Sequence, residues 1–506
     1  MMGRLFLIYF LGMLCSAAAK SQQIIFSESH REDSRDMNFD IIGKLKGNIV
    51  IFKNVRGKYA VNVYDDSMVM KDKVELEFLP TRVFNVDYIP YPDFFYLIYQ
   101  HQKKGVVYCM AVKMGADGKK LNDPIELDTT QVGALGDNKI YSTVYSEDKK
   151  KIMVFKIQKK NEQYHFSTLL YDQQLILRHR SRQFMDYDEE KSKFSEFYLD
   201  NAGSFLFTVA TKTNSRESFS SLSLVTKKAL EDTYLPHKIN LNKTYIDEVK
   251  IKIDNVNNHY IINTFYYPDR SSQIDGIFLS IFDTNKDSSV ATVFTKFDED
   301  LRAVAKASGN AKFAFNDFFI RNIILKKDGS FILHAEDYSS QSTGFNNWNR
   351  NDYLFNSPYL SPFNYYNYNP LYGGFYRPFN SFGNQQNTRY YYENILLISI
   401  SKNGLPEWSN VIHKQQYSDD NDNFLSYNTF IASGEIHFLF NDISKRDKLL
   451  SNYIINPDGS SKRSPTLRTY DKGYDFMPRF AKQIGARQVI IPCTLHGEIC
   501  FAKVDF

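Results

Sequence analysis

The chain has 506 residues, with 62 lysines and arginines against 58 aspartates and glutamates, and 43% of its residues are hydrophobic. These fractions match an ordinary globular protein and exclude intrinsic disorder, a collagen-like chain and a disulfide-stapled miniprotein. The formal net charge of +4 is well short of the strongly basic balance expected of a nucleic-acid binder, so we expect no nucleic-acid partner.

The N-terminal residues 1–19 have the parts of a secretory signal peptide. Arg4 supplies the positive charge, an apolar run follows, and alanines at 17–19 match the small-residue cleavage pattern. The run is shorter than the roughly 20 residues that a membrane anchor needs. A lipid anchor on Cys15 is disfavoured because Leu14 stands where a small residue is required. We therefore predict export to the periplasm or cell surface, with no transmembrane segment after signal removal.

Beyond the signal segment, short runs rich in Val, Ile, Tyr and Phe alternate with turns, and helical periodicity is scarce. This pattern, with an aromatic content of 15%, is typical of all-β proteins. Asp-Gly or Asn-Gly pairs at 117–118, 328–329, 403–404 and 458–459 supply the positive φ of tight hairpin turns.

The strand-like runs group into units of four with a period of roughly 50 residues, which is typical of propeller blades. Units begin near Asp40, Phe84, Tyr141, Phe194, Asp247, Phe319 and Leu425, and a last one ends at Phe506. We predict one β-propeller domain over residues 20–506 with eight four-stranded blades, or seven if one unit is misdivided. Two packed β-sandwiches are the alternative.

The last unit supplies only three strand-like runs before the chain ends. A spare run, QQIIFS at residues 22–27, stands at the mature N-terminus. Pairing of the two chain ends would complete the last blade, close the ring and remove an exposed sheet edge.

A segment of different composition, at about residues 340–389, interrupts one unit. Asn, Tyr, Phe, Pro and Gly dominate it, which predicts a long loop. Rigid aromatic rings beside Asn, Ser and Gly are typical of protein-binding loops, so residues 344–387 form a predicted partner-binding surface. Its anchors would be Trp348, Tyr353, Phe355, Tyr359, Phe363, Tyr365, Tyr366, Tyr372, Phe375, Tyr376 and Phe379. Two alternatives stay open: the loop folds back over its own propeller, or its rings stack on sugars.

Two of the three mature cysteines are placed for pairing. A hairpin turn at His496-Gly497 would set Cys493 opposite Cys500, within the distance that a disulfide bridges. The alternative is two reduced, buried cysteines on neighbouring strands. Cys109 is predicted to be a small core residue.

Specific catalytic and cofactor motifs are absent from the sequence, so we expect no catalytic residues, no cofactor and no metal. His334 and Glu336 would share one face of a strand while Asp337 points the other way. A hydrogen-bonded strand histidine is the favoured interpretation. The run from Asp283 begins like a calcium loop but lacks its glycine and closing glutamate, and the run Asp419, Asp420 and Asp422 is more typical of a solvated loop.

Three stretches resemble a group of exported proteins common in Bacteroidetes. These are FIRNIILKKDGSFILHAEDY from residue 319, YYYENILLISISKNGLPEWSNVIHKQQ from 390 and FLSYNTFIASGEIHFLFND from 424. The shared markers are the Lys-Asp-Gly turn, Glu336, Trp408 with Lys414 and Gln415, and Phe440-Asn441-Asp442. The resemblance implies an exported, propeller-like protein of no established activity and carries no catalytic residues to this chain.

Together these observations favour an exported, non-enzymatic propeller at the bacterial cell envelope. It would act as a protein-binding or scaffold subunit whose partner is an envelope protein, for example in an outer-membrane complex. The alternative is a glycan-binding or glycan-processing propeller, similar to a lectin or a glycosidase. The two differ in that an enzyme needs convergent carboxylates or a metal near the propeller axis.

Overall fold

The computed structural model describes most of the chain outside the N-terminal segment and the insertion. It describes residues 23–29, 37–132, 140–160, 163–186, 188, 190–213, 218–269, 273–305, 313–342, 350, 354, 388–419, 421–444, 447–464 and 473–506.

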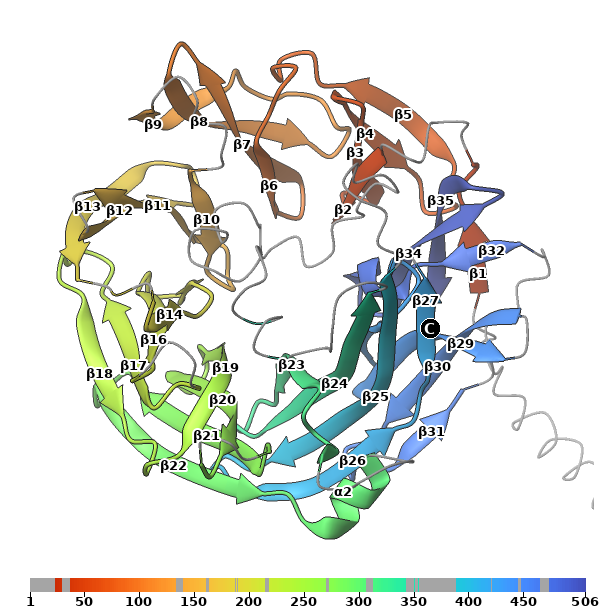
Figure 1. The fold of residues 1–506 in the computed structure, drawn as a ribbon. Coiled ribbons are helices and arrows are strands. Elements are labelled where there is room, and N and C mark those ends of the chain that lie inside the picture. The colour runs from red at the N-terminus through yellow and green to blue at the C-terminus, as the bar shows by residue number, and fades with distance from the viewer. Residues whose placement is uncertain are drawn as a thin grey trace, which may run out of the picture.

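Eight antiparallel sheets stand round a common axis as the blades of a propeller (Figure 1). The strands of each blade are given from the innermost outward. Blade 1 consists of β2 (Met37–Leu45), β3 (Asn48–Val55), β4 (Lys58–Tyr64) and β5 (Met70–Glu75), and blade 2 of β6 (Asn85–Pro90), β7 (Phe94–Lys103), β8 (Val106–Gly115) and β9 (Ile125–Gln131). Blade 3 consists of β10 (Ser142–Tyr145), β11 (Lys151–Lys160), β12 (Gln163–Asp172) and β13 (Leu177–Met185), and blade 4 of β14 (Ser192–Phe194) with β15 (Tyr198–Leu199), then β16 (Phe205–Thr211), β17 (Ser221–Lys227) and β18 (Leu235–Ile239).

The second half of the ring repeats this order. Blade 5 consists of β19 (Tyr245–Asp254), β20 (His259–Tyr267), β21 (Gly276–Asp283) and β22 (Ser288–Lys296). Blade 6 consists of β23 (Phe318–Leu325), β24 (Phe331–Ser342), β25 (Thr388–Ile400) and β26 (Pro406–Ile412), and β27 (Gln416–Asp419) also pairs with β25. Blade 7 consists of β28 (Tyr427–Ala432), β29 (Glu435–Ser444), β30 (Asp447–Ile455) and β31 (Ser461–Arg463), and blade 8 of β32 (Tyr474–Phe476) with β33 (Lys482–Gly485), then β34 (Gln488–Leu495), β35 (Glu498–Asp505) and β1 (Gln23–Phe26). Two short helices, α2 (Glu299–Ala305) and the 3₁₀ helix η4 (Pro478–Phe480), lie between blades 5 and 6 and within blade 8.

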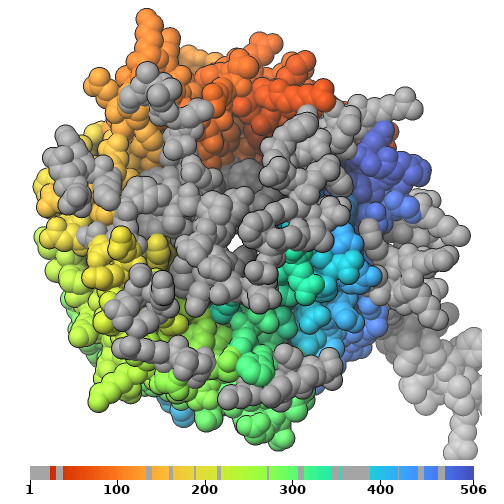
Figure 2. All heavy atoms as spheres, viewed as in Figure 1, coloured from red at the N-terminus to blue at the C-terminus, as the bar shows by residue number. Residues whose placement is uncertain are grey.

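The hydrophobic core lies between neighbouring blades. Middle strands are buried on both faces and read as continuous apolar runs, as in GIFLSIFD of β21, whereas the outer strand β22 is mostly exposed. One cluster joins Ile261 and Leu279 of blade 5 to Phe331 and Leu333 of blade 6. Each blade therefore buries its faces against two neighbours, and the blades follow one another round the ring in chain order (Figure 2).

The two chain ends close the ring, as the strand count predicted. β1 pairs with β35 from Gln23 opposite Asp505 to Phe26 opposite Ala502. The prediction of eight blades is confirmed, and the alternatives of seven blades and of two sandwiches are wrong. In the described part of the chain, no helix is long and apolar enough to cross a membrane.

Candidate functional site

An extended three-stranded ribbon on blade 6 is the most distinctive feature among the described blades. β24 and β25 remain paired beyond the sheet as far as Ser342 opposite Thr388, and β27 adds a third strand from Arg389 opposite Asp419. At 12 and 13 residues, these two strands are the longest of the blades. We call residues 338–342, 388–392 and 416–419 the ribbon; the insertion starts and ends at its tip.

The ribbon surface combines tyrosine and arginine in fixed positions. Arg389 donates from Nε to Asp419 Oδ1 at 2.7 Å and from a terminal nitrogen to Oδ2 at 3.1 Å. Its guanidinium lies 5.2 Å from the centre of the Tyr417 ring, and Tyr417 is 52% exposed. The ring of Tyr391 lies 6.4 Å from that of Tyr417. Such tyrosine and arginine groups are the residues enriched at the energetic centres of protein interfaces.

Two residues of the insertion, Arg350 and Leu354, pack against the propeller. Arg350 is buried and donates from Nε to Asp247 Oδ2 at 2.6 Å, with its guanidinium 4.2 Å from the centre of the Phe319 ring. Leu354 is buried in a small cluster with Phe319 and Tyr392. The predicted alternative in which the insertion folds back is therefore met at these two positions.

The eleven aromatic anchors predicted for partner binding all lie outside the described residues, so that prediction stays a prediction. They are Trp348, Tyr353, Phe355, Tyr359, Phe363, Tyr365, Tyr366, Tyr372, Phe375, Tyr376 and Phe379.

A buried ionic network lies at the base of the ribbon. Glu336 of β24 is fully buried and pairs through Oε1 with Lys414 Nζ at 2.8 Å. Its Oε2 accepts from Arg321 Nε at 3.1 Å and from Ser426 Oγ at 2.7 Å. Burial lowers the pKa of Lys414, and the neighbouring Glu336 carboxylate opposes that shift. One carboxylate thus binds strand β23 and the connections that carry Lys414 and Ser426.

A second group ties blade 8 to the same place. Arg479 of η4 donates to Asp422 Oδ2 at 2.7 Å and to the Tyr392 hydroxyl at 2.9 Å. Tyr392 donates in turn to Asp422 at 2.7 Å, and burial raises its pKa well above the usual value. In the predicted solvated loop, Asp419 and Asp422 are therefore ion-paired, and Asp420 lies outside the described residues.

A pocket opens between blades 6 and 7, beside these two groups. Its volume is about 350 Å³, and its lining includes Arg321 and His334 of blade 6, Tyr427 of blade 7 and Arg479 of blade 8. His334 is 2% exposed, and its Nδ1 lies 2.5 Å from the Tyr427 hydroxyl. Burial lowers the pKa of His334 to about 3, so the imidazole is neutral. The predicted hydrogen-bonded strand histidine is confirmed.

Ionisable side chains also line the innermost strands near the axis. Glu196 and Glu248 both pair with Lys250, at 2.8 and 3.6 Å. Asp40 of β2 differs: burial raises its pKa to about 6, Lys482 opposes the shift and Asp87 adds to it. Across the described parts of the chain, no group of three or more His, Cys, Asp or Glu is placed to hold a metal ion.

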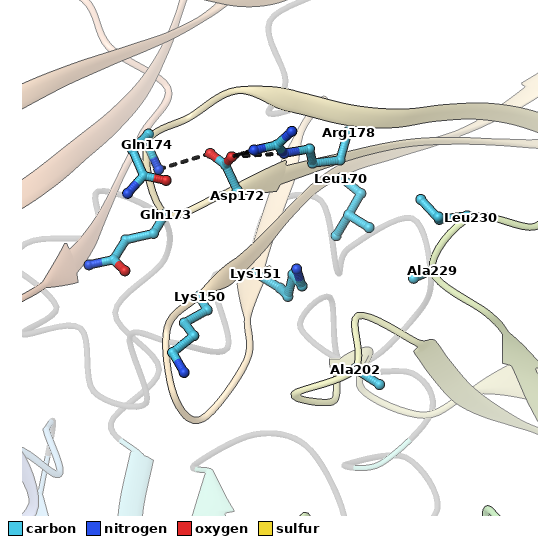
Figure 3. A pocket seen from close by; sticks show the side chains of 10 residues that line it. All are labelled: Lys150, Lys151, Leu170, Asp172, Gln173, Gln174, Arg178, Ala202, Ala229 and Leu230. Atoms are coloured by element: carbon cyan, nitrogen blue, oxygen red, sulfur yellow. Dashed lines mark hydrogen bonds and ion pairs between the residues drawn. The ribbon is translucent and has the colours of Figure 1, made fainter.

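A second pocket lies at the opposite ends of the strands, between the turns of blades 3 and 4 (Figure 3). It has a volume of about 470 Å³ and is lined by Lys150, Lys151 and Arg178, among others. Arg178 donates from Nε to Asp172 at 2.8 Å, and its side chain is 52% exposed. Turn residues and the adjoining strand ends of blades 3 and 4 form this pocket.

The remaining sequence predictions concern local structure. Cys493 lies opposite Cys500, and their sulfur atoms are 2.9 Å apart as buried thiols. The predicted pairing register is confirmed, and formation of the disulfide stays a prediction. Cys109 is a fully buried core residue. The Asp283 side chain accepts hydrogen bonds from the backbone N–H groups of Asn285 and Lys286 in its own turn, as expected for a polar hairpin turn.

Sequence reasoning assigned no role at a site to Arg321, Tyr392, Lys414, Ser426 or Arg479, and it named Lys414 only as a marker of the resemblance. A usable signal existed for the first: Arg321 interrupts the apolar run FFIRNIIL of a buried strand, and a charge in such a run is seldom unpaired. The other four come from separate segments, and only the fold brings them together.

No protein-family model matches the chain, and no curated protein matches it. Among solved structures, it is similar to one from a structural and mechanistic analysis of two prolyl endopeptidases, with a TM-score of 0.42 and 8% identity over 92% of this chain and 55% of the other. It is also similar to prolyl oligopeptidase B from Galerina marginata, at 0.41 and 10% over 92% and 56%. The β-propeller domain of the Trilobed protease from Pyrococcus furiosus gives 0.34 and 8% over 84% and 93%. This chain spans about half the length of the first two, 55% and 56%.

Proposed function

We propose that the protein is an exported, non-enzymatic propeller that binds another protein as a scaffold subunit at the bacterial cell envelope. The contact surface would be the ribbon of blade 6 together with the aromatic insertion that it carries. Export is proposed from the signal-like residues 1–19, and the resemblance to exported Bacteroidetes proteins supports the same compartment.

One observation carries the proposal: blade 6 alone among the described blades lengthens its middle strands into a three-stranded ribbon. A third strand and the Arg389–Asp419 pair restrict its motion before any partner binds. Rigid tyrosine and arginine groups lose little conformational entropy on binding, so they suit a recognition surface. Arg350 and Leu354 pack against the propeller, so they hold the insertion to it at these two positions.

The carboxylates near the axis differ in their surroundings. Lys250 lowers the pKa of Glu196, whereas burial raises the pKa of Glu248 and of Asp40. Of these three, only Glu196 is held in the ionised form that makes a carboxylate a poor general acid.

Affinity purification from gently solubilised envelopes tests the proposal. We expect wild-type protein to retain a stoichiometric partner, and the double variant Tyr391→Ser with Tyr417→Ser to lose most of it. Val256→Ser is the matched control, because Val256 is 76% exposed on a turn at the opposite ends of the strands. A second variant replaces residues 356–386 by a short flexible linker and leaves Arg350 and Leu354 in place.

Three results bear on the outcome. Loss of the partner in the ribbon variant but not in the Val256→Ser control supports the ribbon as the interface. Retention of the same partner by every variant would show that the interface lies elsewhere. Absence of any stoichiometric partner from wild-type envelopes would contradict the scaffold role itself.

A further inference from the structure

The pocket between blades 6 and 7 has an unusual lining. Every described side chain that lines it carries a hydrogen-bonding group, and none of them is a carboxylate. Two guanidiniums, of Arg321 and Arg479, reach it from different blades. A pocket of about 350 Å³ falls in the range of small-molecule sites, which are usually walled by apolar side chains. This lining suits a ligand with several polar groups, and the rings of Tyr392 and Tyr427 supply its apolar contacts.

The two guanidiniums are fixed in position by acids that do not line the pocket. Glu336 holds Arg321 at 3.1 Å, and Asp422 holds Arg479 at 2.7 Å. Both guanidinium carbons lie 5.9 Å from the centre of the Tyr392 ring. Because the arginines are oriented before any ligand binds, their guanidinium groups can donate hydrogen bonds to an anion with little further loss of entropy, while Glu336 and Asp422 offset part of their charge.

His334 supplies an independent sign of a ligand. Its Nε2 is buried and has no hydrogen-bond partner among the described residues. Nδ1 forms a hydrogen bond with the Tyr427 hydroxyl. Nε2 is the second hydrogen-bonding nitrogen of the neutral ring, and it can bind a ligand. A buried polar atom without a partner is costly, and a bound polar group would remove that cost.

We propose that this pocket binds a small polyhydroxylated carboxylate of the size of a sugar acid. Arg321 and Arg479 would hold the carboxylate, and His334, Asn428 and Thr429 would meet the hydroxyl groups. The guanidiniums favour an acid over a neutral sugar, and a lining in which every described side chain carries a hydrogen-bonding group disfavours fatty acids. The ligand could be a free sugar acid or the uronate end of a polysaccharide, which share this chemistry. This inference is independent of the ribbon proposal.

Titration calorimetry with purified full-length protein tests the inference. The probes are glucuronate, galacturonate, gluconate, trigalacturonate, glucose and sulfate. We expect the acids to bind with about millimolar affinity or better, and glucose at least about tenfold more weakly. Tighter binding of trigalacturonate than of its monomer would assign the ligand to a polysaccharide end, and equal binding would assign it to a free acid; both outcomes support the pocket.

Variants localise the binding to this pocket. Arg321→Gln should weaken the affinity for uronate at least about tenfold, and Thr429→Val by about three- to tenfold. Arg178→Gln is the matched control, because Arg178 is also an arginine paired with an aspartate beside a pocket, between other blades (Figure 3). If circular dichroism shows that Arg321→Gln does not fold, Arg321→Lys replaces it, since it keeps the charge and loses the planar fork.

Four results would overturn the inference. They are no binding of any acid, equal binding of glucose, sulfate binding as tightly as uronate, or equal weakening by Arg178→Gln and Arg321→Gln. Each is distinguishable from failure of the ribbon proposal, because none depends on an envelope partner.

Discussion

Asp40 lies on the innermost strand of the first blade, and burial raises its pKa from 3.8 to about 6. The folded chain therefore holds this proton more tightly than the unfolded chain. The stabilisation is complete below the unfolded pKa and is lost as the pH rises through the folded pKa. Asp40→Asn cannot ionise, so we expect it to raise the free energy of unfolding at neutral pH, by at most about 3 kcal/mol.

Urea unfolding between about pH 4 and 8 measures this effect. The difference between Asp40→Asn and wild type should be small at the acid end and grow through about pH 6. Asp66→Asn is the control of opposite sign, because hydrogen bonding to Lys44 lowers the pKa of Asp66. It should lose less than about 1 kcal/mol at neutral pH, since Asp66 is largely exposed. Parallel curves for Asp40→Asn and wild type would contradict the raised pKa.

One turn glycine allows close contact between the turn of one blade and a tryptophan of its neighbour. Gly459, in the turn between β30 and β31, has a φ of +85°, and a Cβ there would lie 2.5 Å from Trp408 Cδ2 on blade 6. Gly434 has a similar φ of +83° but no atom within 4 Å of such a Cβ. Both alanine variants incur the backbone cost of about 1–2 kcal/mol, and only Gly459→Ala should lose about 1–3 kcal/mol more through the clash.

Thermal and urea unfolding of the two variants gives this difference directly. Equal destabilisation would mean that the Trp408 contact contributes nothing beyond the turn itself. Near-ultraviolet circular dichroism provides a second measurement, since displacement of Trp408 should change its signal in Gly459→Ala and leave it unchanged in Gly434→Ala.

Local features of the elements could be predicted from the sequence, and their lateral contacts could not. The Asp-Gly and Asn-Gly pairs are turns, with Gly118, Gly329, Gly404 and Gly459 all at positive φ, because a turn depends on adjacent residues. Strand β32 was missed, since three residues give too little pattern. The groups round Glu336 were missed for another reason: their members come from β23, β24 and two later connections. Neither periodicity nor spacing predicts contacts between residues that are far apart in the sequence.

Closure of the ring depends on the four residues of β1, Gln23–Phe26. β1 is the outer strand of blade 8, where Ile24 and Phe26 pack into the blade core and Phe26 stacks on Tyr474 at 4.0 Å. Without β1, β35 would become an exposed sheet edge, and the joint between the first and last blades would lose its covalent connection. The eight interfaces between blades support one another, so weakening one joint affects the whole ring.

Removal of residues 20–27 should therefore lower the free energy of unfolding by about 3–5 kcal/mol, from the apolar side chains that leave the core. We also expect the shortened protein to associate through β35, which light scattering would detect. A synthetic peptide of residues 20–29 should restore the midpoint of thermal unfolding by adding the missing strand in trans. A peptide of the same length with Ile24 and Ile25 replaced by lysine is the control. An unchanged midpoint after truncation would show that the interfaces between blades hold the ring closed, and that the pairing of β1 with β35 contributes little.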